Sequence, residues 1–85
     1  MNSKVKIKVR LFAVLREEIG SHELNLEFPQ GAVCREVVGY LKNNFPSLDS
    51  LLERSLLAIN GVYANPCSDI FEGDEVAVLP PVSGG

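Results

Sequence analysis

The sequence contains no long run of apolar residues, and its longest apolar stretches are only a few residues long. A helix that spans a membrane needs roughly 20 such residues in succession. The first four residues, Met1 to Lys4, lead into a charged segment rather than into the apolar centre of a signal peptide. These absences predict a chain with no membrane segment and a cytoplasmic location.

Cysteine and positive charge are also scarce. Cys34 and Cys67 are separated by a distance that does not match metal-ligand motifs, so no metal site is expected. With no secretory segment, both should be reduced thiols, Cys34 near the apolar stripe of a helix and Cys67 in an exposed loop. The formal net charge is −3. That acidity argues against a nucleic-acid binder, which concentrates positive charge to neutralise phosphates.

The groups that would make an independent enzyme are absent as well. The seven glycines are dispersed and match neither the dinucleotide nor the P-loop spacing. His22 is the only histidine, and we expect it to be a solvated side chain on a strand. The acidic pairs Glu17-Glu18 and Asp74-Glu75 are adjacent in sequence, so their carboxylates do not converge on one substrate. No catalysis is expected from this chain alone.

What the sequence does contain is the pattern of one small globular domain, 46% hydrophobic and 22% charged over 85 residues. The segment KVKIKVRLF, starting at Lys4, alternates strictly between basic and apolar residues and predicts a strand with one buried face. HELNLEF, starting at His22, alternates again and is expected to be its antiparallel partner. Between them, AVLREEIG predicts an irregular or single-turn helical segment that ends at Gly20.

From Ala32 the apolar period changes to three or four residues, and AVCREVVGYLKNNF predicts an amphipathic helix of about fourteen residues that ends before Pro46. Gly39 inside it suggests a close approach to a strand. SLDSLLERS predicts a second, short helix with Ser47 or Asp49 as its N-cap.

The remaining segments complete a sheet. LLAINGVYA predicts a hairpin whose turn is Asn60-Gly61, because both residues tolerate positive φ. Gly73-Asp74 predicts another turn, and EVAVL, residues 75–79, is apolar enough to be a central strand. We therefore expect an α+β fold of the β-grasp type, in which a mixed sheet carries one main helix on one face plus a short helix.

The last six residues, PPVSGG, form a distinct segment. Pro80 and Pro81 restrict φ, so the chain should leave the sheet in an extended direction. We expect residues 1–81 to form the β-grasp domain and residues 82–85 a flexible tail, which reaches about 13 Å at ~3.3 Å per residue. Glycine has no Cβ, so the tail can thread a narrow channel and deliver the Gly85 α-carboxylate to another protein. A carboxylate is a poor acyl donor, so a partner must activate it.

Three segments, VRLFAVLREEIG, LLAINGVYA and GDEVAVLPPVSGG, resemble the small subunit of molybdopterin synthase, a ubiquitin-like sulfur carrier family. The resemblance covers essentially the whole chain. It implies that an adenylating enzyme of the ubiquitin-activating type uses ATP to adenylate Gly85, and that a sulfur donor then converts the adenylate to a thiocarboxylate. Sulfur would pass to cyclic pyranopterin monophosphate to form the molybdopterin dithiolene. No cofactor is expected to be bound permanently.

The resemblance also implies partners and site residues. The partner is a large catalytic subunit, two copies of which join two small subunits in a heterotetramer. Gly85 would carry the sulfur, Gly84 would be its threading neighbour, and Val82 and Ser83 would complete the inserted tail behind Pro80 and Pro81. Three apolar side chains, Phe12, Tyr63 and Leu79, match contact positions for the large subunit, with core packing as the alternative reading of each.

Two other readings remain open. A carrier for thiamine or another sulfur product, or a ubiquitin-like modifier joined to lysines, would use the same activated carboxylate with a different acceptor. A plain binding module would leave the tail idle.

Overall fold

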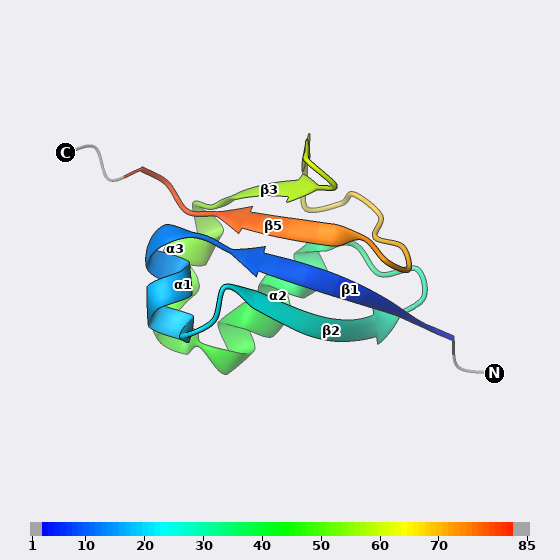
Figure 1. The fold of residues 1–85 in the computed structure, drawn as a ribbon, viewed down its shortest axis with the longest axis horizontal. Coiled ribbons are helices and arrows are strands. Elements are labelled where there is room, and N and C mark those ends of the chain that lie inside the picture. The colour runs from blue at the N-terminus through cyan, green and yellow to red at the C-terminus, as the bar shows by residue number, and fades with distance from the viewer. Residues whose placement is uncertain (1–2, 83–85) are drawn as a thin grey trace.

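In the part of the chain that the structure describes, five strands form one sheet in the order β2-β1-β5-β3-β4 (Figure 1). The computed structural model describes residues 3–82. Its elements are β1 (Lys4–Leu11), α1 (Ala13–Ile19), β2 (Glu23–Pro29), α2 (Cys34–Asn44), the 3₁₀ helix η1 (Pro46–Leu48), α3 (Asp49–Glu53), β3 (Leu56–Ile59), β4 (Val62–Ala64) and β5 (Glu75–Leu79).

The sheet is mixed, as the sequence predicts. β1 pairs antiparallel with β2 and parallel with β5, and β3 pairs antiparallel with both β5 and β4. The last strand is central, and its residues Val76 and Val78 are fully buried. These pairings confirm the antiparallel first hairpin, the turn at Asn60-Gly61 and the β-grasp arrangement.

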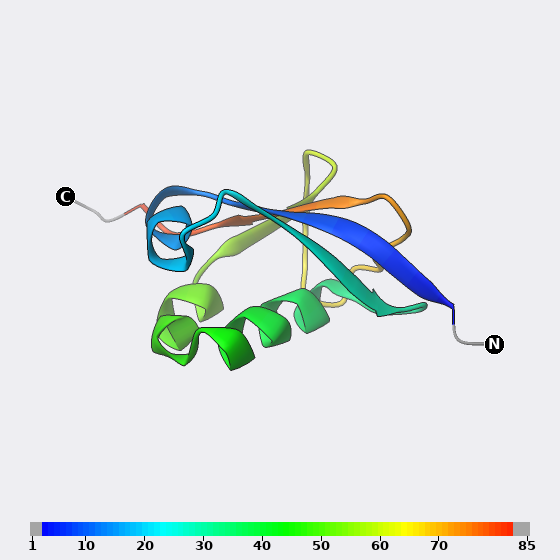
Figure 2. The ribbon, with the colours of Figure 1, turned by 60° about the horizontal axis from the view of Figure 1, so that its bottom comes forward.

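One face of the sheet forms the core, and α2 and α3 lie on that side (Figure 2). β1 contributes every second residue to the core, so its four basic residues point the other way. α2 contributes a stripe spaced by three and four residues. The core residues of these two elements are Val5, Ile7, Val9, Leu11, Cys34, Val37 and Leu41.

The main helix is shorter than the predicted span of residues 32–45. Val33 is extended and forms a β-bridge with Asp69, and its N–H donates to the Glu36 carboxylate at 2.9 Å. Helical dihedrals therefore begin only at Cys34. At the other end Phe45 leaves the helical region, because a residue before proline is sterically restricted.

Two other helical expectations also need correction. The segment after β1 is a seven-residue helix rather than a single turn, and Gly20 ends it in the left-handed region with φ 81°. Neither Ser47 nor Asp49 caps the second helix, because Leu48 precedes α3 and η1 runs directly into it.

Gly39 does not mark a close approach of α2 to a strand, since a Cβ added there would meet no atom within 4 Å.

The predicted turn between β3 and β4 is confirmed, because Asn60 and Gly61 both have positive φ, 50° and 84°. Within residues 3–82, no helix is long and apolar enough to cross a membrane.

Candidate functional site

The tail begins where β5 ends. The sequence predicts that Gly85 carries the sulfur and that Gly84 and Ser83 belong to the tail that presents it. All three lie outside the described residues. The described part, Pro80 to Val82, leaves the carboxyl end of β5 beside α1 and α3, at the opposite end of the molecule from the N-terminus (Figure 1). The Val82 side chain is 93% exposed. The described end of the tail is therefore exposed to solvent.

A groove lies at the base of the tail, with a volume of ≈ 630 Å³. Val14 of α1 and Leu51 and Arg54 of the α3 region form its walls, and Pro80 and Pro81 complete it. Pro80 is half-buried and Pro81 is exposed. Because proline fixes φ, this short rigid segment sets the direction in which the tail leaves the body.

The sheet face opposite α2 carries an apolar patch. Leu56 pairs with Leu79, and Ala58 lies between Tyr63 on β4 and Ala77 on β5. Side chains alternate along a strand, so these residues point away from buried Leu57, Val76 and Val78. We call this set the outer-face patch: Phe12, Leu56, Ala58, Tyr63, Ala77 and Leu79.

The three apolar contact residues predicted from the sequence lie on the same side of the sheet, Phe12 and Leu79 at its tail end and Tyr63 on the edge strand β4. Leu11 pairs with Val78, so Phe12 follows β1 at the level where Leu79 ends β5. Tyr63 is 74% exposed, whereas Phe12 and Leu79 are half-buried. None of the three belongs to the buried core.

Sequence reasoning missed three patch residues, Leu56 and Ala58 on β3 and Ala77 on β5. Leu56 is 59% exposed, whereas Ala58 lies on the same face but is only 7% exposed. The sequence contained the information needed to place them. Adjacent side chains on a strand point to opposite faces of the sheet, so only one of Leu56 and Leu57 can face the core. The same alternation places Ala77 and Leu79 outward once Val76 and Val78 are assigned inward.

A charged strip borders the outer-face patch along β1. Lys8 lies 3.8 Å from Glu23 of β2, and Arg10 lies 3.7 Å from Glu75 of β5, both measured between nitrogen and carboxylate oxygen. Arg10 also has its guanidinium carbon 5.8 Å from the centre of the Phe12 ring. The outer face therefore joins an apolar area near the tail to a basic strand.

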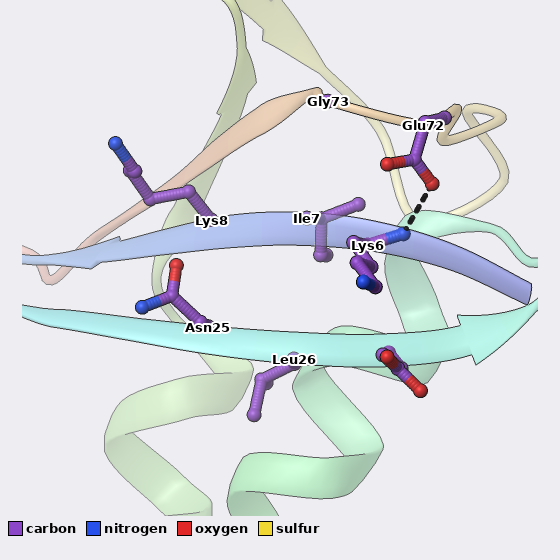
Figure 3. A pocket seen from close by; sticks show the side chains of 8 residues that line it. Lys6, Ile7, Lys8, Asn25, Leu26, Glu72 and Gly73 are labelled. Carbon is purple, nitrogen blue, oxygen red and sulfur yellow. Dashed lines mark hydrogen bonds between the residues drawn. The ribbon is translucent and has the colours of Figure 1, made fainter.

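A shallow pocket of ≈ 420 Å³ lies at the far end of that strip (Figure 3). Its lining includes Lys6, Lys8 and Asn25, and Glu72 reaches across to accept a hydrogen bond from the Lys6 backbone N–H at 2.8 Å. Charges of both signs line it, and it lies on the β1–β2 side of the sheet, away from the tail.

The two cysteines lie as predicted. Cys34 is fully buried and Cys67 is exposed. Burial, and secondarily the charge of Asp74, raises the pKa of the Cys34 thiol. His22 is exposed but precedes β2 rather than lying on it, which corrects its predicted place. No group of three or more His, Cys, Asp or Glu residues within 3–82 is arranged to hold a metal ion.

Comparisons with solved structures identify the fold. Small archaeal modifier protein 1 from Haloferax volcanii superposes with a TM-score of 0.82 at 26% identity, over 92% of this chain and 99% of that chain. A protein–protein complex of subunits 1 and 2 of the molybdopterin-converting factor from Helicobacter pylori contains a chain that superposes with a TM-score of 0.65 at 23% identity, over 95% of this chain and all of that one. The fold is the ubiquitin-like β-grasp.

Comparisons of sequence identify the family. Residues 9–85 match the ThiS family. The molybdopterin synthase sulfur carrier subunit of Arabidopsis thaliana is 39% identical over 98% of this chain and 86% of its own length. The protein of the same name from Chlamydomonas reinhardtii is 36% identical over 95% of this chain and all of its own length. The chain therefore belongs to the ThiS family, together with the molybdopterin synthase sulfur carrier subunits.

Proposed function

We propose that this chain is the sulfur carrier subunit of molybdopterin synthase and that Gly85 carries the sulfur as a thiocarboxylate. The observation that carries the proposal is the likeness to curated sulfur carrier subunits, at 39% and 36% identity over nearly the whole chain. The family match extends through Gly85. The exposed exit of the chain at Val82, beyond a rigid proline pair, supports a tail that other proteins can reach.

The proposed chemistry needs Gly85 to bear a free α-carboxylate. A carboxylate oxygen attacks the α-phosphorus of ATP on an adenylating enzyme, and pyrophosphate leaves. A donor that delivers sulfur at the level of hydrosulfide then attacks the carbonyl carbon, and AMP leaves. The thiocarboxylate sulfur displaces an oxygen substituent of cyclic pyranopterin monophosphate, and water then cleaves the resulting thioester, which leaves sulfur on the precursor and restores the Gly85 carboxylate. A second loaded chain supplies the second sulfur of the dithiolene.

In this sequence of steps, the folded domain would be the part that partner proteins recognise. The large catalytic subunit would dock on the outer-face patch while the tail enters its pocket. The apolar area on that side of the sheet comes from Phe12, Leu56, Tyr63 and Leu79. Apolar and aromatic side chains of this kind form the centres of protein interfaces.

Intact-mass measurement tests the carrier step. After incubation with ATP, the adenylating enzyme and a sulfur source, the protein should gain the mass expected for replacing one oxygen by sulfur, and the gain should map to Gly85. A variant with one alanine added after Gly85 is the matched control and should gain nothing. A wild-type protein that never acquires sulfur would refute the proposal.

A second candidate, a protein modifier joined to lysines, is favoured by one observation. The structural likeness to small archaeal modifier protein 1 is close, with a TM-score of 0.82. Both candidates predict adenylation of Gly85, but they differ in the acceptor. Conversion of cyclic pyranopterin monophosphate by the sulfur-loaded chain and its large subunit supports the first. Isopeptide-linked conjugates, found by peptide mapping without that conversion, would support the second.

A further inference from the structure

Among the residues that the structure describes, Arg10 is the one cation that lies in a row with patch residues across the outer face. The register of the sheet places Arg10 opposite Ala77 of β5 on one side and Glu23 of β2 on the other. Ala77 pairs with Ala58, which pairs with Tyr63. A partner that covers the outer-face patch therefore also reaches the Arg10 side chain, which is 43% exposed.

The hydrogen-bonding capacity of Arg10 is poorly used by the protein itself. Its Nε–H is buried and has no acceptor among the residues that the structure describes. Its Nη1 approaches Glu75 only to 3.7 Å, which is beyond hydrogen-bond distance. An ion pair between two such exposed groups contributes little to stability. The interaction with Glu75 therefore does not explain a guanidinium at this position.

The Phe12 ring restricts where the guanidinium can go. The guanidinium carbon lies 5.8 Å from the ring centre, a separation within the range of a cation–π contact. An arginine held against an aromatic ring loses less freedom when it forms a further bond, and its planar fork matches the two oxygens of a carboxylate. Arg10 is thus positioned for an acceptor that residues 3–82 do not supply.

We propose that Arg10 binds a carboxylate side chain of the large subunit and is the polar anchor of the docking face. This inference rests on the proposed function, because it takes the large subunit as the partner of the outer-face patch. A single carboxylate fits better than a phosphate, since Glu75 and Glu23 flank Arg10 and would repel an anion of higher charge. Burial of the pair beneath the partner would strengthen it relative to water.

The consequence is selection among partners. The patch alone would accept any complementary apolar surface, whereas an arginine buried without a carboxylate would oppose binding. A large subunit that places Asp or Glu opposite Arg10 is accepted, and one that places an apolar or basic side chain there is rejected.

The experiment compares binding of the purified large subunit from the same organism to wild type and to three variants, by titration calorimetry at low and high salt. Arg10→Gln should raise Kd about 10- to 100-fold and weaken its salt dependence. Arg10→Lys should fall between Arg10→Gln and wild type, because it keeps the charge and loses the fork. Lys4→Gln removes one charge from the same face of β1, far from the patch, and should change Kd less than about twofold.

The acceptor is then located on the large subunit by changing its Asp and Glu residues singly to Asn and Gln. One of these changes should weaken binding to wild type and have no further effect on Arg10→Gln, the non-additivity of a direct pair. Unchanged melting temperatures would show that the variants are folded.

Two outcomes would overturn the inference: an Arg10→Gln variant that binds within about twofold of wild type, or full additivity with every acidic residue tested. Either result would leave the proposed function intact, because sulfur loading of Gly85 is measured separately by mass. Failure of wild type to load sulfur would instead remove the carrier role.

Discussion

Leu56 on β3 lies directly opposite Leu79 on β5, so two leucine side chains stand together on the sheet face away from buried Leu57 and Val78. Leu56 is 59% exposed, and Leu79 is the last residue before the proline pair that begins the tail. Exposed leucine pairs contribute little to the stability of a monomer. In the proposed function this pair belongs to the docking surface, and its position would couple docking on the sheet to delivery of the tail.

Replacing Leu56 or Tyr63 by threonine should weaken binding to the large subunit about 10-fold or more, because central apolar side chains carry most of the energy of an interface. Threonine is β-branched and favours a strand, so the free energy of unfolding should change by about 0.5 kcal/mol or less. Calorimetric titration measures the first effect and urea unfolding the second.

Phe71 provides the matched control for the patch variants. It is 64% exposed, but it lies in the loop before β5, at the end of that strand opposite the tail. Phe71→Thr should leave Kd unchanged. Equal weakening by Phe71→Thr and Leu56→Thr would show that general surface apolarity, and not the outer-face patch, determines binding.

The Asn60 side chain should stabilise the fold through two hydrogen bonds to the turn before β5. Its Nδ2 donates to Asp74 Oδ1, and its Oδ1 accepts from the Glu75 N–H, both at 2.9 Å. Asn60→Gly keeps the positive φ and loses these bonds, at a cost of about 1–2 kcal/mol. Asn60→Ala should cost about 1 kcal/mol more, because alanine is strained at φ 50°.

Urea unfolding of these two variants separates side-chain bonding from backbone strain. Asn25→Ala, an exposed change on β2, serves as the comparison and should lie within about 0.5 kcal/mol of wild type. An Asn60→Gly protein as stable as wild type would mean that the two hydrogen bonds make no net contribution.

Strands were predictable from the sequence because their signal is local. The alternation from Lys4 to Leu11 fixes which side chains face the core, and Asn60-Gly61 fixes one hairpin. The same rule would also have placed Leu79 on the outer face, since Val76 and Val78 must face inward. Leu79 could be assigned to the interface or to the core only as long as it was considered without the alternation of Val76 and Val78 on the same strand.

Helix ends were less predictable because distant contacts decide them. The main helix begins late since Val33 pairs with Asp69, more than thirty residues away in the chain. Arg10 is a similar case: alternation places it outward, but only the pairing of β1 with β5 brings it beside Ala77 and Glu75. The chemistry proposed for Gly85 rests on family resemblance, because two glycines carry no structural signal of their own.

The thiols should differ sharply in reactivity. Cys67 is exposed, so iodoacetamide should alkylate it in the native protein, whereas buried Cys34 should react only on unfolding. Mass spectrometry after a timed exposure should find a single adduct, on Cys67. A native protein modified at both sites would contradict the close packing of Cys34.

Burial also makes stability depend on alkaline pH. Because the fold raises the pKa of Cys34, the folded chain holds this proton more tightly than the unfolded chain. The stabilisation is present below the ordinary thiol pKa of 9.0 and is lost as the pH rises through the higher folded value. The free energy of unfolding should therefore fall above pH 9.0 less steeply in Cys34→Ala than in Cys67→Ala.

The proline pair should strengthen binding by limiting the freedom of the unbound tail. Pro80 and Pro81 hold φ near one value, so the tail loses less conformational entropy when the large subunit orders it. Replacing both by glycine should cost about 0.5–1 kcal/mol for each and raise Kd roughly 5- to 30-fold, while the melting temperature changes little. Pro66→Gly, in the loop after β4, should leave Kd unchanged. Sulfur loading should persist in the double variant, because both substitutions leave the Gly85 carboxylate in place, and a loss of loading without weaker binding would show that the prolines serve activation instead.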